Sequence, residues 1–166
     1  MLVRRERRSD TRAVRAVTDR AFAPSTMEGA LLDELRGDPG WIPALSLVAT
    51  IDDAVVGHLV ATRAHIGDAP ALGLGPVSVD PRHQRRGVGS ALMHAVLGAA
   101  DALDEPVVVL LGSPQYYHRF GFVLAEPLGI IAPVPAWSPH FQARPLTTYN
   151  PSLRGPFRYA APFPLD

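Results

Sequence analysis

Residues 77–92 read VSVDPRHQRRGVGSAL, and this stretch decides the fold of the chain. It runs from a short β-branched strand through a basic turn into a helix that opens with Gly87 and Gly89. A helix N-terminus presents backbone N–H groups that lack intrahelical partners, and its dipole favours a negative charge. Because Arg85 and Arg86 stand beside these groups, the stretch predicts a site for a phosphate-bearing ligand.

Two other phosphate-binding patterns do not fit this stretch. The chain contains no lysine, which excludes the P-loop pattern because that pattern ends on a lysine and a hydroxyl residue. The dinucleotide fingerprint G-x-G-x-x-G matches at Gly87 and Gly89, but Leu92 stands where the third glycine is required. An unrelated nucleotide-binding enzyme is therefore disfavoured. A well-capped helix without a ligand stays open as the simpler alternative.

The composition is that of a globular domain. The chain has 166 residues, of which 47% are hydrophobic and 19% charged, and its formal net charge is +0. A neutral balance gives no reason to expect binding to nucleic acid or to an anionic membrane surface. The absence of cysteine excludes thiol nucleophiles, disulfides and thiolate metal sites. Without a signal peptide or an apolar run long enough to span a membrane, a cytoplasmic protein is expected.

Hydrophobic periodicity and turn residues predict a mixed order of strands and helices. The expected helices follow Ser9 up to Pro24, run from about Glu28 to Gly37 and from about Arg86 to Leu103, and cover 116–120 briefly. The expected strands are 2–8, 46–51, 55–66, 72–79, 107–111, 141–148 and 157–159. Pro76 predicts a bulge or an unpaired edge in its strand. We expect one α/β domain over 1–166, with a core of about 2–125 and a proline-rich β tail of about 126–166.

A second motif follows the predicted third helix and a buried strand. Residues 111–122 read LGSPQYYHRFGF. The stretch QRRGVGS at 84–90 resembles the acetyl-CoA pyrophosphate loop of the GNAT N-acetyltransferase superfamily, and 111–122 resembles the last conserved turn of that family. The resemblance is closest to bacterial members with an LGxPxYYxRFGF run. It implies a mostly antiparallel central sheet, splayed between its fourth and fifth strands, with helices on both faces.

The resemblance also implies acetyl-CoA as the acetyl donor and indicates where it binds. The strand backbone at Val77, Ser78 and Val79 is expected to pair with the pantetheine amides. Glycines without side chains let a pyrophosphate approach the backbone closely. The pyrophosphate is expected at the helix start, on Gln84, Arg85, Arg86, Gly87, Val88, Gly89 and Ser90.

The implied reaction is direct transfer of acetyl from CoA to a primary amine. Tyr117 matches the family's tyrosine that donates a proton to the CoA thiolate, while Tyr116 is its competitor and aromatic packing the alternative for both. Some members of the family carry a carboxylate that acts as the general base early in the pantetheine strand. Residues 72–75 of this chain read LGLG and contain no such base. Glu28, His58 and His65 are therefore the candidates for removing the proton of the amine, and a core position is favoured for His58. Glu28 also fits a first-turn acid stabilised by the helix dipole, and His65 a merely exposed strand end.

The remaining histidines and aromatics have plainer interpretations. His58 shares strand parity with Val56 and Val60 and is expected in the core, and the six histidines lack ligand spacing, so no metal is predicted. The tail aromatics either wall the acceptor site or close the core, and the second option is favoured: Trp137, Phe141, Tyr149 and Tyr159.

The sequence thus predicts an acetyl-CoA-dependent N-acetyltransferase. The alternative is a GNAT-fold module that binds acyl-CoA or CoA as a sensor without catalysis. The acceptor is expected to be a small-molecule or peptide amine whose identity the residues do not reveal. The oligomeric state is left open, a homodimer included.

Overall fold

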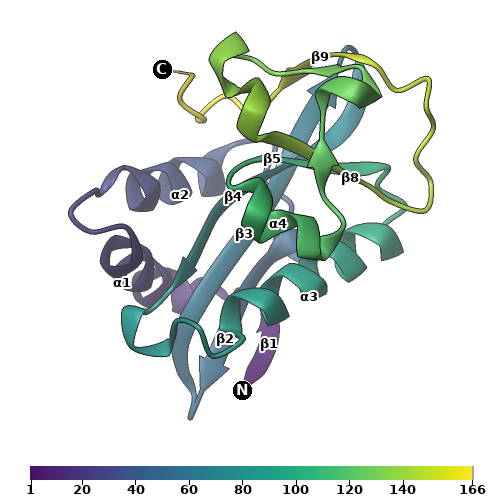
Figure 1. The fold of residues 1–166 in the computed structure, drawn as a ribbon. Coiled ribbons are helices and arrows are strands. Elements are labelled where there is room, and N and C mark those ends of the chain that lie inside the picture. Colours follow the sequence, from purple (N-terminus) through teal and green to yellow (C-terminus); the bar gives the residue numbers. More distant parts are fainter. Residues whose placement is uncertain (166) are drawn as a thin grey trace.

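A mixed β-sheet runs through the centre of the molecule (Figure 1). The computed structural model describes residues 1–165, and Asp166, the last residue of the predicted tail, lies outside the described residues. The sheet follows the order β1-β2-β3-β4-β5-β8-β6, and β9 pairs with β3 and β7. The strands are Leu2–Arg5 (β1), Ser46–Ile51 (β2), Ala54–Ile66 (β3), Ala69–Val79 (β4), Val107–Leu111 (β5), Val123–Leu124 (β6), Ile130–Ile131 (β7), Phe141–Pro145 (β8) and Gly155–Arg158 (β9).

Helices cover both faces of the sheet, as Figure 1 shows. Strand alternation creates a core on each side. In β3, Leu59 packs with Leu92 on one face, while its neighbour Val60 packs with Val14 on the other, and all four side chains are fully buried. The helices are Thr11–Phe22 (α1) and Met27–Gly37 (α2) on the Val60 side, Val88–Ala102 (α3) on the Leu59 side, and the short Pro114–Tyr117 (α4) after β5.

The two middle strands of the sheet, β4 and β5, separate halfway along their length. They run parallel and pair only at Leu72 and Gly73 of β4. Further along, the register of β4 against β3 shifts by one residue around Gly75 and Pro76, which confirms the bulge expected from the proline. From residue 74 to 79, no strand within the described part of the chain pairs with this edge of β4. The predicted splay between the fourth and fifth strands is therefore confirmed.

Several helix and strand boundaries differ from expectation for local reasons. The first strand ends at Arg5 instead of residue 8, because Asp10 accepts the Arg7 backbone N–H and pairs with Arg4, which forms a 3₁₀ turn. The third helix begins at Val88, two residues later than predicted, because Gly87 has a φ of 84° that no right-handed helix contains.

The helical spacing of the apolar residues predicts Ala102 and Leu103 on the buried stripe of the third helix, and this prediction is wrong. Ala102 and Leu103 are exposed, whereas Met93 and Ala100 are fully buried.

The proline-rich tail extends the same sheet. Its strand β8 pairs with β5, and Phe141 and Phe157 are buried against each other with ring centroids 5.4 Å apart. The strands β8 and β9 end at Pro145 and Arg158, earlier than expected. None of the helices in residues 1–165 is long and apolar enough to cross a bilayer.

Candidate active site

The turn before α3 presents a row of unpaired backbone N–H groups. Arg85 and Gly87 both lie in the left-handed region, with φ angles of 57° and 84°, and such turns form concave N–H nests that bind anions. The first helical bond is the one from Ala91 N–H to Gly87 O, so the N–H groups of the three residues between them have no intrahelical partner. The turn thus has the geometry that phosphate oxygens require.

A cavity of about 300 Å³ lies directly beside this turn. We call it the loop cavity. A Cβ atom on Gly89 would lie only 3.0 Å from the Tyr116 hydroxyl, so the glycine lets the tyrosine close one wall. The cavity is lined by Ala21, Phe22, Val77, Val79, Gln84, Arg85, Gly89, Tyr116 and Tyr117.

The open edge of β4 turns backbone groups toward the same region. Asp80 N–H donates to Val56 O of β3 at 2.9 Å, and alternate residues of an antiparallel strand point their backbone groups to the same side. The backbone N–H and C=O groups of Ser78 and Asp80 therefore face β3. Those of Val77 and Val79 face away from β3, into the gap between β4 and β5. The Val79 carbonyl already accepts a bond from the Gln84 side chain at 3.1 Å.

The backbone of Ser78 was expected to pair with the pantetheine amides, but in the structure it already pairs with β3. The buried hydroxyl of Ser78 lies 2.9 Å from that of Thr18 in α1. Ser78 thus anchors α1 to β4, and Val77 and Val79 provide the free edge.

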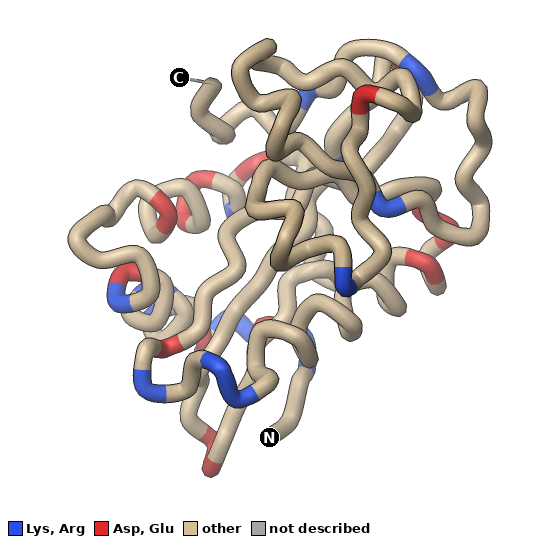
Figure 2. The backbone as a smooth tube through the Cα atoms, viewed as in Figure 1, with Lys and Arg blue, Asp and Glu red and all other residues tan. Residues whose placement is uncertain are grey.

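The basic residues of the turn divide into two groups. Arg82 is held by Asp80, whose carboxylate also pairs with Arg20 at 2.8 Å. The hydrogen bonds from Arg82, together with Arg20, hold the pKa of the buried Asp80 well below its usual range. Arg85 and Arg86 are exposed and make no ion pair with any described residue, so their charges are available. Figure 2 shows this concentration of basic residues on the loop that follows β4.

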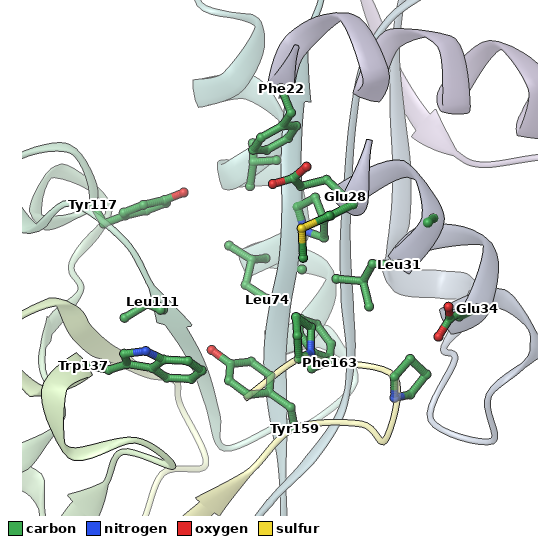
Figure 3. Close-up of a pocket in the computed structure, with 17 residues that line it drawn as sticks. Phe22, Glu28, Leu31, Glu34, Leu74, Leu111, Tyr117, Trp137, Tyr159 and Phe163 are labelled. Carbon is green, nitrogen blue, oxygen red and sulfur yellow. The ribbon is translucent and has the colours of Figure 1, made fainter. Parts of the chain in front are cut away.

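A second cavity, of about 770 Å³, opens where β4 leaves β5. We call it the large cavity (Figure 3). It lies between α2 on one side and the β5–α4 turn and the tail on the other. The residues that line it are Phe22, Met27, Glu28, Ala30, Leu31, Glu34, Leu74, Gly75, Pro76, Val77, Leu111, Tyr117, Trp137, Tyr159, Pro162, Phe163 and Pro164.

Tyr117 stands at the junction of the two cavities. It shares this place with Phe22 and Val77, which also line both. Burial of the phenol raises the pKa of Tyr117 to about 12. Tyr116 lines the loop cavity only, and both tyrosines also pack against the core, Tyr116 beside Phe120 and Tyr117 beside Phe122.

The two candidates for the proton acceptor lie in different places. Glu28, in the first turn of α2, lines the large cavity and accepts a 2.6 Å hydrogen bond from Ser25. In Figure 3 its carboxylate points toward Tyr117 across the cavity. His65 lines neither cavity, because β3 carries it to the end of the sheet, where it pairs with Arg158 of β9. The geometry therefore does not bring His65 to the site.

The tail aromatics split between the two interpretations. Phe141 is core and Tyr149 packs against the core, but Trp137 and Tyr159 line the large cavity. Gly73 in β4 was the signal that the sequence analysis missed for Tyr159, because a glycine within a strand often marks the close approach of another group. A Cβ on Gly73 would lie 2.7 Å from the Tyr159 ring. Phe22 and Phe163 were also missed as lining residues, and no pattern in the sequence marks them.

His58 is a core residue, as predicted. It is fully buried, and its Nε2 lies 3.0 Å from both Glu6 Oε2 and the Ser46 hydroxyl. Within residues 1–165, no group of three His, Cys, Asp or Glu side chains is arranged to hold a metal ion.

Comparison with known proteins agrees with this geometry. A family model described as an acetyltransferase (GNAT) domain matches residues 3–125. The uncharacterized N-acetyltransferase YjhQ of Escherichia coli K12 is 34% identical over 163 residues, covering 93% of this chain and 90% of YjhQ. These matches cover most of each protein.

Two solved structures of similar chains contain the donor or its product. The GNAT family N-acetyltransferase YhbS from Escherichia coli in complex with CoA superposes with a TM-score of 0.91 at 29% identity, covering 98% of this chain and 91% of that one. A GNAT family acetyltransferase from Brucella melitensis in complex with acetyl-CoA gives a TM-score of 0.81 at 34% identity, covering 98% and 97%.

Proposed function

The chain belongs to the GNAT acetyltransferase family, and from this premise we propose how its own residues move acetyl from acetyl-CoA to an amine acceptor. The protein is an N-acetyltransferase that uses acetyl-CoA, and its acceptor is unidentified. One observation carries the proposal: Tyr117 lines both the loop cavity and the large cavity. We assign the loop cavity to the donor and the large cavity to the acceptor, so that transfer takes place at their junction.

The residues around the loop cavity fit acetyl-CoA. The free N–H groups at the start of α3 would hold the pyrophosphate, and the unpaired charges of Arg85 and Arg86 would neutralise it. The outward-facing backbone of Val77 and Val79 would bind the pantetheine amides as a neighbouring strand does. When bound, acetyl-CoA supplies a thioester with an activated acetyl group.

The large cavity supplies a proton acceptor for the incoming amine. An amine with a pKa of about 10.4 is mostly protonated at pH 7 and cannot attack in that form. Glu28 would take this proton, directly or through a water molecule, because its carboxylate points into the cavity toward Tyr117. The amine nitrogen then bonds to the acetyl carbon, and the carbon–sulfur bond breaks.

Tyr117 would protonate the leaving group of the reaction, the CoA thiolate. The departing thiolate needs one proton, and the phenol of Tyr117 would donate it at the junction. The second proton of the amine nitrogen leaves as the amide forms and passes, directly or through water, to the Tyr117 oxygen, which restores the phenol. Burial raises the pKa of this phenol to about 12, which keeps it protonated. The same desolvation raises the proton affinity of a thiolate beside it, so the direction of transfer is maintained.

Replacing Tyr117 by Phe tests this assignment. A general acid contributes about 10²–10⁴-fold to a rate, so kcat, followed by release of the CoA thiol, is expected to fall about 100-fold or more. Calorimetry is expected to show an unchanged affinity for acetyl-CoA. Tyr116→Phe is the control, because this neighbouring ring lines the loop cavity but not the large one.

Two outcomes would contradict the proposal. Full activity of Tyr117→Phe would remove the acid role from this residue. Tight binding of acetyl-CoA without thiol release above the buffer rate, for every amine tried with the unaltered protein, would favour a binding module without catalysis.

A further inference from the structure

We propose that the acceptor is a lipophilic aromatic amine that carries its positive charge on the reacting nitrogen and has no anionic group. This inference rests on the proposed function, because it takes the large cavity as the acceptor site. It names the chemical class for which the walls of that cavity are built.

The charged groups of the large cavity all have the same sign. Glu28 and Glu34 are the acidic residues among its lining, and the described lining contains no arginine. Figure 2 shows the acidic residues along α2, while the loop after β4 carries basic ones. A cationic acceptor is attracted by this arrangement, and a carboxylate or phosphate on the acceptor would have no cation in the cavity to pair with it.

In the described part of the chain, no arginine pairs with either of these two carboxylates. Within residues 1–165, Glu28 is bonded only to the Ser25 hydroxyl, and Glu34 is exposed without an ion pair. Their negative charge is therefore available to a ligand. Arginines pair with the acids Glu6, Asp10, Asp19, Asp33, Asp80 and Glu105.

Aromatic rings form much of the remaining lining of the cavity. Tyr159 and Phe163 stack with ring centroids 4.4 Å apart, and Trp137 lies beside Tyr159 in Figure 3. Phe22 adds a further ring near Glu28. Aromatic walls bury apolar surface and attract cations through their faces. An acceptor with an aromatic body would cover these rings, whereas a thin polyamine would leave most of their surface uncovered.

The position of each carboxylate suggests its part. Glu28 lies opposite Tyr117, where the reacting nitrogen must be, and Glu34 lies further along α2, away from Tyr117 (Figure 3). Their positions in the sequence differ by six, which is about 9 Å along a helix axis. Glu34 therefore acts on the charge of the whole acceptor, attracting cations and repelling anions, without touching the reacting atoms.

Tryptamine and tryptophan provide a matched pair, because they differ only in a carboxylate. We expect kcat/KM for tryptamine to exceed that for tryptophan at least about tenfold, and tryptophanamide, which lacks the anionic charge, to recover most of the difference. Spermidine is expected to be a poorer acceptor than tryptamine. Calorimetry in the presence of CoA is expected to show the same order of affinities, independently of turnover.

Glu34→Gln tests the origin of this selectivity. We expect it to narrow the tryptamine-to-tryptophan ratio at least about threefold, because the repulsion of the carboxylate is weakened. Glu126→Gln is the matched control, since Glu126 is an exposed glutamate that lines neither cavity of the site. It is expected to leave the ratio unchanged.

Other results would overturn the inference. If tryptophan or spermidine equals or exceeds tryptamine, or if Glu34→Gln leaves the ratio unchanged, the acceptor class is wrong while the acetyltransferase assignment stands. If acetyl-CoA binds but no amine of any class is acetylated, the proposed function itself fails, and an equal affinity for tryptamine and tryptophan then overturns the acceptor class separately.

Discussion

The phenol of Tyr117 owes its protonation state to burial rather than to a charged partner. Burial is the main cause that raises its pKa to about 12, with a smaller contribution from Tyr116. A group that acts as an acid is active in its protonated form, so its contribution to the rate is lost only as the pH rises through that pKa.

The pH profile of kcat at a saturating concentration of the acceptor is expected to reflect this pKa. No falling limb occurs below about pH 11, because the phenol of Tyr117 keeps its proton until the pH approaches its pKa of about 12. Steady-state thiol release over that range measures it. A falling limb centred near pH 10 would show that Tyr117 titrates with its ordinary pKa, contrary to the burial seen in the structure.

At the scale of the element, the N-terminus of α3 and the free edge of β4 form one donor site. The first three N–H groups of the helix have no intrahelical partner, and the left-handed conformations of Arg85 and Gly87 shape the turn in front of them. The absence of a side chain on Gly89 leaves room for the Tyr116 hydroxyl. Neither element has these properties alone, since the loop cavity exists only because β4 has already left β5.

Gly89→Leu is expected to weaken acetyl-CoA binding. The new side chain would start 3.0 Å from the Tyr116 hydroxyl and project into the loop cavity. Overpacking costs about 1–3 kcal/mol, so the Kd is expected to rise about tenfold or more in a calorimetric titration. The fold of the variant is monitored by its thermal unfolding.

Gly98→Leu is the matched control on the same helix. Nothing lies within 4 Å of a Cβ at Gly98, and the residue is exposed. Leucine is the better helix former by up to about 1 kcal/mol, so this variant is expected to keep its affinity and gain slightly in stability. Equal affinities of the two variants would place the donor outside the loop cavity.

At the scale of the molecule, a buried polar network joins the first strand to the core of the sheet. Glu6 pairs with Arg36 at 2.8 Å and with the imidazole of His58 at 3.0 Å. Burial lowers the pKa of His58, despite the nearby carboxylate. Its Nδ1 atom has no hydrogen-bond partner, which fits a neutral ring with its proton on Nε2.

This network predicts a loss of stability at mildly acidic pH. A histidine kept neutral in the folded state gains its proton in the unfolded chain below about pH 6.5. The free energy of unfolding therefore decreases by up to about 1.4 kcal/mol for each unit by which the pH is lowered. Burial opposes the ionisation of Glu6, but the bonds from His58 and Ser46 and the charge of Arg36 lower its pKa. The stability that Glu6 contributes is therefore lost only below about pH 4.5.

Denaturant titrations at pH 7.5 and 5.5 measure the effect of His58. The unaltered protein is expected to be less stable at the lower pH. His58→Gln, although less stable at both values, is expected to show a smaller difference between them. The same pH dependence in both proteins would show that His58 is not held neutral in the fold.

The sequence predicted those features that are local or that follow from a family motif. The GNAT family, the splayed sheet, the bulge at Pro76 and acetyl-CoA as donor are confirmed. The residue roles stay predictions, and the sequence indicated the placement of the loop, Tyr117 and Glu28. His65 could not be excluded from the sequence, because its distance from the site depends on the pairing of β3 with β9. The cavity wall of Tyr159 and Phe163 depends on long-range packing of the tail, which leaves no periodic pattern.

A crystal structure of the protein bound to CoA tests the central claim, which is that donor and acceptor meet at Tyr117. We expect the pyrophosphate oxygens to accept hydrogen bonds from the N–H groups at the start of α3. The sulfur of CoA is expected to contact the Tyr117 hydroxyl at the entrance to the large cavity. A pyrophosphate bound elsewhere, or a sulfur outside contact with Tyr117, would contradict the account.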